Sequence, residues 1–510
     1  MFAWETTGWG EFVKVTWSSS FQEYVNQQNP ENLGRFNDFF SRFCNCCKID
    51  KTETSQLWRD FELAFLYYAK HNVPIQQALS LLDTKFLGTF YEESSYKWFS
   101  LDDAAKLYPM SMKRGYMSVY RLSICLHETV IPELLQMALD FTIKRFPAFA
   151  TTLKKGFFWH YLDETNRRYR IEQEKEIPCQ PIKVSRSGSP SLRVIYFQNR
   201  ISVEFFHVLS DGLGSITFLI ALASEYLRLT GKDILLDESV FDINDVPDKE
   251  EMENAFRKVP YESTNLTGPH KAAVQIRGKL SKVKPCRIIH FKMDALQLKS
   301  ISEKYGTTVT GYMLSILLLA TKQVSSVKKG IINIQIPVNL RKYYDSKTIR
   351  NFVLPCGIGF PIEEIQNVSG MIPNINTQLR SKTSKKAISA SVTSTERLID
   401  FVRYVPLAIK QPAAKIGYGF LGDRAFTSIL SNLGVIKIPP SLSKHIHSMA
   451  AVIGPSITQR ARCALITFQN IATLSITKST VIPDFEEEVY RLICSDGINT
   501  TIEGSELYGD

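Results

Sequence analysis

Apolar and polar residues follow two regular periods along the chain, and these periods predict its strands and helices. Strict alternation of apolar and polar positions is typical of strands, and an apolar residue every three or four positions is typical of helices. Proline and glycine mark the ends of several elements, because proline cannot continue a helix and glycine caps one well. In the first half of the chain the predicted elements are strands at 119–126, 191–197 and 201–206 and helices at 131–146 and 213–229.

The same order of elements returns in the second half of the chain. A strand at 286–293, a helix that begins after Asp294, an apolar helix at 308–320 and a strand at 331–340 follow one another. We predict two lobes of similar build, although the two halves share no visible sequence identity. Further strands at 463–469 and 472–478 and a helix at 483–494 complete the second half.

Two other segments have a different character. Residues 1–95 are helical in pattern and rich in aromatic residues, and the amphipathic stretch at 58–71 either lies on a membrane or, as we prefer, packs against the body of the protein. Residues 241–285 are polar and have no period, which predicts a linker. The predicted organisation is a helical extension at 1–95, a first lobe at 96–240, a linker at 241–285 and a second lobe at 286–510.

Length and charge narrow the class of protein. The chain has 510 residues, more than one compact core accommodates, and its formal net charge is +10. A basic chain suits a polyanionic partner, but a solvated basic surface explains the charge as well, and we favour the surface. Because no motif for reading or stacking on bases accompanies the charge, we expect no nucleic-acid partner.

Compartment and metal content follow from the ends of the chain and from its cysteines. The opening MFAWETTGWG does not have the pattern of a secretory signal, and the longest apolar run, around 312–320, is shorter than the roughly 20 residues that cross a bilayer. We expect a cytoplasmic protein without a transmembrane segment, which leaves peripheral contact with a membrane open. The nine cysteines are expected to be free thiols, and Cys44, Cys46 and Cys47 lack the second pair that a structural zinc site needs, so we predict no metal site.

The sequence HVLSDG, between the predicted hairpin and the apolar helix, carries the most informative chemistry. The strand delivers His207 at its end, where a side chain can face a cleft. Imidazole, with a pKa of about 6.5, can take a proton from a hydroxyl or an amine at neutral pH. Asp211 lies on a tight loop that leads into a helix, so we expect it to cap that helix rather than to orient the imidazole. Gly212 lets the backbone turn closely into the helix, and the plainer alternative is that His207 is only a core histidine at a strand end.

H-x-x-x-D-G between a strand and an apolar helix, in a chain of two similar lobes, resembles the superfamily of chloramphenicol acetyltransferase, peptide-synthetase condensation domains and alcohol acyltransferases. The resemblance extends over most of the chain after the helical extension, and the alcohol acetyltransferase branch is the most similar. The D-F-G-W-type motif of other branches is absent. The matching segments are Arg145-Phe146-Pro147-Ala148, Pro337-Val338-Asn339-Leu340-Arg341 with Arg350-Asn351-Phe352, and Ser431-Asn432-Leu433-Gly434.

The resemblance implies an α+β fold in which two lobes, each a mixed sheet flanked by helices, form a central channel around His207. It implies an acyltransferase in which His207 deprotonates an alcohol or amine, which then attacks the thioester carbonyl of acyl-CoA. Ser431 or Asn432 is then expected to bind the oxyanion, and Asp211 to hold its loop through an ion pair with Arg341. Acyl-CoA enters as a co-substrate, no permanently bound cofactor is implied, and a monomer is expected because the two lobes complete the site.

Two questions stay open at this point. A basic cluster at Arg380, Lys382, Lys385 and Lys386 is a candidate for holding the phosphates of coenzyme A, although most such clusters are only solvated surface. Two other functions also fit: a condensation-like enzyme that takes its acyl group from a carrier protein in trans, or an inactive relative that binds a lipid or a partner protein. The intact HVLSDG and SNLG sequences speak against the inactive relative.

Overall fold

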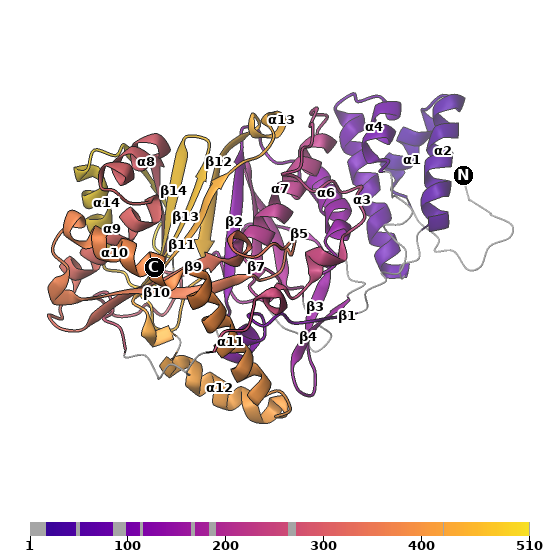
Figure 1. Ribbon diagram of the computed structural model, residues 1–510. Helices are drawn as coiled ribbons and strands as arrows, with labels where there is room; N and C mark the ends of the chain where they lie inside the picture. Colours follow the sequence, from indigo (N-terminus) through magenta and orange to yellow (C-terminus); the bar gives the residue numbers. More distant parts are fainter. Residues whose placement is uncertain are drawn as a thin grey trace.

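The computed structural model describes residues 17–46, 51–84, 98–112, 116–164, 169–182, 190–263, 272–421 and 423–508. Figure 1 shows a helical extension at one end of the molecule, followed by two lobes built around a five-stranded and a seven-stranded sheet. The chain therefore has the two-lobed architecture that its repeated order of elements predicts.

The N-terminal extension consists of helices α1 (Ser19–Asn26), α2 (Pro30–Cys46), α3 (Lys51–Lys70) and α4 (Ile75–Leu82). Its interior is aromatic: the rings of Phe36, Phe40 and Phe65 lie against one another. Phe61 on α3 contacts Phe141 of the first lobe, with 6.3 Å between ring centroids. The amphipathic stretch at 58–71 thus packs against the body of the protein, as we preferred from its pattern. Cys47 and the side chains of Cys44 and Cys46 lie outside the described part of the chain.

The first lobe is built on the five-stranded sheet, whose strand order is β12-β2-β7-β6-β5. Neighbouring strands are antiparallel except for β5, which runs parallel to β6. Helices α6 and α7 pack against each other beside this sheet (Figure 1). The elements are β2 (Val119–Leu126), α6 (Pro132–Arg145), β5 (Ile171–Gln173), β6 (Leu192–Phe197), β7 (Arg200–Phe206) and α7 (Gly212–Leu229).

Next to this lobe lies a small sheet in the order β1-β4-β3, made of β1 (Trp98–Ser100), β4 (His160–Glu164) and β3 (Thr151–Lys155). The short helix α5 (Leu107–Ser111) follows β1. This segment brings Asp102 and Tyr108 to the boundary between the two lobes, where the candidate site is found.

Helix α7 is apolar around most of its circumference because it is enclosed by the first lobe. It is the one helix in the described part of the chain that is long and apolar enough to cross a membrane, but 78% of its 18 residues are buried within the protein. It is also a longer apolar segment than the run at 312–320, which corrects our expectation about the longest run. The short polar residues Ser215 and Ser224, both buried, interrupt its apolar pattern in the sequence.

The second lobe is built on the seven-stranded sheet, with strand order β10-β9-β11-β13-β14-β8-β15. Asp294 caps α8, as its position before the predicted helix suggested, by accepting from the amide of Gln297, and Thr308 caps α9 by accepting from that of Gly311. Helix α9 packs against α10 and α14. The elements are β8 (Arg287–Asp294), α8 (Ala295–Lys304), α9 (Val309–Val324), β9 (Ile331–Asn339), β10 (Val353–Pro361), α10 (Val368–Lys382), α11 (Lys385–Phe401), α12 (Leu407–Leu421), β11 (Ser428–Ile436), α13 (Pro440–Ser443), β13 (Ala461–Phe468), β14 (Ile471–Lys478), α14 (Asp484–Ser495) and β15 (Thr500–Gly504).

The two lobes are joined at two places. Strand β12 (Ile446–Ile453) lies in the second half of the sequence but pairs with β2 of the first-lobe sheet. In its described part, the segment predicted as a linker contains the short 3₁₀ helices η2 (Lys249–Met252) and η3 (Ala255–Lys258). Within it, buried Glu251 accepts two hydrogen bonds from Arg145 of the first lobe, at 2.6 and 2.7 Å, and its carbonyl accepts from Ile349 of the second lobe. Both connections hold the lobe boundary together.

Candidate active site

His207 is the first residue after strand β7 and lies at the boundary between the lobes. Its amide donates to the carbonyl of Ser118 at 2.9 Å, which fixes the backbone where the strand ends. The side chain is half-buried. Its ring stacks on Tyr108 of α5, with 4.4 Å between centroids, and meets the ring of Tyr120 edge-on at 4.9 Å. Two aromatic rings therefore hold the imidazole in place.

The two nitrogens of the His207 ring have different surroundings. Nδ1 lies 2.9 Å from Oδ1 of Asn351, a fully buried residue of the second lobe. Across the residues that the structure describes, Nε2 makes no hydrogen bond, and the side chain retains partial exposure. One nitrogen is thus held by the protein while the other is left for a ligand.

Asp211 joins the HVLSDG loop to both lobes. Its Oδ1 accepts from the amides of Leu213 and Gly214 at 3.1 and 3.2 Å, which caps α7 as predicted. Its Oδ2 accepts from Nη1 of Arg341 at 2.7 Å and from the amide of Phe352 at 2.8 Å. The expected ion pair with Arg341 is therefore present. The Asp211 carboxylate makes these four hydrogen bonds and none to the imidazole within the described residues, as expected for a residue that holds the loop.

The glycines after Asp211 allow a close approach between the lobes. A Cβ on Gly212 would lie 2.4 Å from Cδ2 of Leu433, and a Cβ on Gly214 would lie 1.8 Å from the carbonyl oxygen of Ile349. The second contact is with backbone, which cannot move aside as the end of a side chain can. The start of α7 thus lies close against the second lobe at two points, and the role of Gly212 in the turn stays a prediction.

The SNLG sequence lies on β11, and Leu433 brings it to Gly212. The amide of Asn432 is engaged within the second lobe: Nδ2 donates to Thr310 at 3.0 Å, and Oδ1 accepts from the amide of Gly434 at 2.9 Å. Ser431 is half-buried, and its hydroxyl makes no hydrogen bond within the described part of the chain. Of the two predicted oxyanion donors, Ser431 keeps its hydroxyl available and Asn432 is largely occupied.

The basic cluster that we singled out for coenzyme A lies on α10 and α11. Lys382 donates to the carbonyl of Gly357 at 2.6 Å, and Lys386 lies 4.0 Å from Glu262. Arg380 and Lys385 are exposed. None of the contacts that the described residues make joins this cluster to the HVLSDG loop, so its role in binding coenzyme A stays a prediction.

Burial sets the charge state of the site. It lowers the pKa of His207 below the ordinary value, and the nearby charge of Asp211 only partly opposes this effect. Burial also raises the pKa of Asp102, whose carboxylate contacts Asn351, while the charge of Arg350 acts in the opposite direction. The imidazole is therefore neutral at neutral pH and able to accept a proton.

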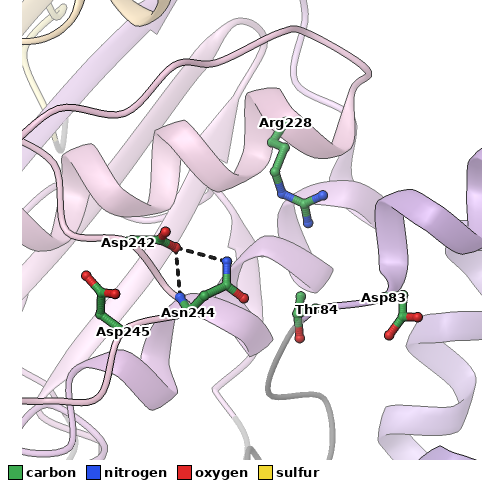
Figure 2. Close-up of a pocket in the computed structure, with 6 residues that line it drawn as sticks. All are labelled: Asp83, Thr84, Arg228, Asp242, Asn244 and Asp245. Carbon is green, nitrogen blue, oxygen red and sulfur yellow. Dashed lines mark hydrogen bonds between the residues drawn. The ribbon is translucent and has the colours of Figure 1, made fainter.

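Two pockets lie outside the immediate surroundings of His207. One, of about 580 Å³, opens at the lobe boundary between the small sheet and α11, and Leu101, the neighbour of Asp102, is among its lining residues. The other, of about 300 Å³, lies where the end of α4 meets the first lobe, and Figure 2 shows Asp242 in it accepting hydrogen bonds from Asn244. Neither pocket is lined by His207. In the described part of the chain no group of three or more metal-binding side chains is placed to hold a metal ion, and the six cysteines whose side chains the structure describes are free thiols.

The sequence did not single out three of the residues that surround His207. Asn351 belongs to the R-N-F element that we matched, but nothing in its spacing indicated that it reaches the imidazole. Asp102 and Tyr108 lie in the segment LDDAAKLYPM, which carries no motif. Only the tertiary fold brings them to a histidine about 100 residues later in the chain, as the contacts of Asn351 and Tyr108 show.

Comparisons with known proteins show what fold the chain has but do not assign it to a sequence family. No family model matches the chain, and no curated protein matches it either. Among solved structures, TRI101 of Fusarium sporotrichioides complexed with coenzyme A and T-2 is similar at a TM-score of 0.55 and 11% identity, covering 79% of this chain and 100% of that one. The TRI3 trichothecene 15-O-acetyltransferase of the same organism gives 0.52 and 12%, covering 79% and 97%. The epimerization domain of the third module of tyrocidine synthetase B gives 0.53 and 12%, covering 79% and 96%. The chain therefore has the two-lobed fold of chloramphenicol acetyltransferase-like acyltransferases and condensation domains.

Proposed function

We propose that this protein is an acyltransferase that moves an acyl group from acyl-CoA to an alcohol or an amine, with His207 as the general base. One observation carries the proposal: a neutral imidazole at the lobe boundary is bonded to the protein through Nδ1, while Nε2 is not bonded by the described residues. A general base needs this combination, because the nitrogen that takes the proton must be both unprotonated and accessible.

The reaction follows from this arrangement. Nε2 of His207 takes the proton of the acceptor hydroxyl or amine as its oxygen or nitrogen attacks the thioester carbonyl. The resulting tetrahedral oxyanion needs a hydrogen-bond donor, and we assign this role to the hydroxyl of Ser431 because the amide of Asn432 already bonds Thr310. When the intermediate collapses, the carbon–sulfur bond breaks and the thiolate of coenzyme A takes the proton back from the imidazolium.

The choice of donor rests on fold similarity and on the residues of the site. The similar TRI101 structure contains coenzyme A, and the TRI3 protein is named as an O-acetyltransferase. The HVLSDG loop of this chain is intact, and its Asp211–Arg341 ion pair is formed. We propose acyl-CoA as a free co-substrate and a small alcohol or amine as the acceptor.

The test is release of free thiol from acetyl-CoA and longer acyl-CoAs in the presence of a panel of alcohols and amines. We expect release that depends on the acceptor, and a loss of roughly 10²–10⁴-fold in kcat for His207→Ala. His290→Ala is the matched control, because His290 is another half-buried histidine whose Nδ1 is hydrogen-bonded, at 2.8 Å to Ser475, but in the second-lobe sheet. Equal rates for wild type and His207→Ala would remove His207 from the mechanism.

A second donor is favoured by one comparison. The chain is similar to an epimerization domain of a peptide synthetase, and the second candidate donor is an acyl group carried by a carrier protein. The same assay separates the two donors: turnover with free acyl-CoA supports the first, and turnover only with an acylated carrier protein supports the second.

A further inference from the structure

The side-chain amide of Asn351 makes three hydrogen bonds, and together they determine which way the amide faces. Nδ2 donates to the backbone carbonyl of His207 at 3.0 Å and to Oδ2 of Asp102 at 3.2 Å. Both partners are obligatory acceptors when Asp102 is ionised, so the nitrogen of the amide must face them. Oδ1 then faces Nδ1 of His207 at 2.9 Å.

The orientation of this amide determines the state of the imidazole. An amide oxygen only accepts hydrogen bonds, so Nδ1 must carry the proton of the neutral ring. The lone pair is then on Nε2, the nitrogen that the described residues leave unbonded. In histidine generally, the hydrogen bond made by one ring nitrogen determines whether the other carries the proton.

Asp102 holds the amide in this orientation. Its carboxylate is fully buried, its Oδ1 accepts from the amide of Ala105 at 2.7 Å, and Arg350 lies 3.6 Å from its Oδ2. Arg350 itself donates to the carbonyl of Ser100 at 2.7 Å. If the amide of Asn351 turned over, its oxygen would face the carboxylate oxygen of Asp102 and the carbonyl of His207, and both contacts would become repulsive.

We propose that Asn351 is the positioning residue of His207, that it keeps the proton on Nδ1 and the lone pair on Nε2, and that Asp102 fixes the amide of Asn351 for this purpose. The inference rests on the proposed function, because a fixed lone pair matters only if Nε2 takes a proton. Asn351 comes from the second lobe, His207 from the first, and Asp102 from the segment that follows β1. The tautomer of His207 is therefore fixed only when these three parts of the chain lie against one another.

The opposite hypothesis is that Asn351 only fills buried space and satisfies Asp102. Kinetics and spectroscopy separate the two hypotheses. Asn351→Leu keeps the branch at Cγ and removes both the acceptor and the donor. Asn333→Leu is the control, because Asn333 is a half-buried asparagine whose amide also donates to a carbonyl, that of Ala425 at 2.8 Å, within the second lobe.

For Asn351→Leu we expect kcat to fall by roughly 10- to 100-fold with KM for both substrates nearly unchanged, a part of the roughly 10²–10⁴-fold that a general base contributes. Asn333→Leu should leave kcat near that of wild type. Equal kcat in Asn351→Leu and wild type would overturn the proposal.

The double exchange Asp102→Asn with Asn351→Asp tests the pair directly. Asn351→Asp alone places two carboxylates against each other, and we expect it to be impaired. In the double variant the amide at position 102 can donate to the carboxylate at position 351, which can still accept from Nδ1. The carbonyl of His207 loses the donor that Asn351 supplied, so the recovery should be partial. We expect kcat to recover by at least about tenfold over Asn351→Asp, with the acidic limb of the pH profile shifted upward, because a carboxylate beside the ring favours the imidazolium. No recovery would count against the role of Asp102.

A readout that does not require turnover keeps the inference separate from the proposed function. The protein with ¹⁵N-labelled histidine, assigned by comparison with His207→Ala, reports the tautomer because protonated and unprotonated ring nitrogens have well-separated ¹⁵N shifts. We expect Nδ1 of His207 to be protonated and Nε2 unprotonated in wild type at neutral pH. A protonated Nε2 in wild type would overturn the inference, whatever the activity. The expected tautomer in a protein that transfers no acyl group would instead overturn the proposed function and leave the placement of the proton intact.

Discussion

Arg341 donates from Nη1 to Oδ2 of Asp211 over 2.7 Å, and this ion pair joins the second lobe to the loop that carries His207. Both side chains are nearly enclosed, with 10% and 1% of their surfaces exposed. Arg341 also donates to the carbonyls of Thr348 and Arg350, at 2.9 and 2.6 Å, so its guanidinium is held on three sides. The pair therefore belongs to the structure of the lobe boundary and supports catalysis by holding the loop.

Arg341→Met should destabilise the protein by about 3–5 kcal/mol, because it leaves the buried carboxylate of Asp211 without its charged partner. Denaturant unfolding measures this free energy, and activity should fall with it as the HVLSDG loop loosens. Arg35→Ala is the control: its ion pair with Glu31 is exposed on both sides, and such pairs contribute about 0–1 kcal/mol. A similar small effect for both variants would show that the Asp211–Arg341 pair does not hold the boundary.

The sequence predicted the elements that have strong periods and short-range caps. The hairpin of β6 and β7, the helix α7 and its cap Asp211 follow from residues that are near one another in the chain. The ion pair of Asp211 with Arg341 came from the resemblance, not from spacing, and the structure confirms that it is formed.

Long-range relationships could not be read from the sequence. Strand β12 has no local feature that says it pairs with β2, more than 300 positions earlier, as the register of Ile446 with Leu126 shows. Helices α10, α11 and α12 were also not predicted, and two of them contain an internal proline, Pro373 and Pro412, which argues locally against a helix. Tertiary packing decides these elements, and it also decides that Asn351 reaches His207.

Gly214 and Gly212 should differ in their tolerance of alanine. The Cβ of an alanine at 214 would meet the backbone oxygen of Ile349 at 1.8 Å, so the lobes must separate locally, and we expect a loss of roughly 1–3 kcal/mol. The Cβ at 212 would meet only the end of the Leu433 side chain at 2.4 Å, which can rotate away. Thermal and denaturant unfolding of the two variants should therefore show a clear loss for Gly214→Ala and a small one for Gly212→Ala. The reverse order would contradict the close backbone approach.

The pH dependence of activity should reflect the buried imidazole. Burial lowers the pKa of His207 below 6.5, so the neutral, proton-accepting form persists at lower pH than for a free histidine. Activity should be at its plateau at neutral pH and fall only as the pH drops through the lowered pKa, because the imidazolium cannot accept a proton. The profile of kcat/KM against pH measures this, with an acidic limb whose midpoint lies below 6.5. A midpoint at or above that value would mean that the imidazole is more solvated than its contacts with Tyr108 and Tyr120 indicate.

Replacing Ser431 and replacing Asn432 by alanine should cause different defects, the first in kcat and the second in stability. If the hydroxyl of Ser431 binds the oxyanion, Ser431→Ala loses a contact made only in the transition state, and kcat should fall by about 10²–10³-fold while KM and stability change little. Asn432 bonds Thr310 at the start of α9 and the amide of Gly434, so Asn432→Ala should loosen the SNLG strand end and lower the free energy of unfolding by about 1–3 kcal/mol. Steady-state kinetics beside denaturant unfolding of the two alanine variants distinguishes these effects. An intact kcat in Ser431→Ala would assign the oxyanion to another donor, and a large loss of kcat without a loss of stability in Asn432→Ala would identify that donor as the amide of Asn432.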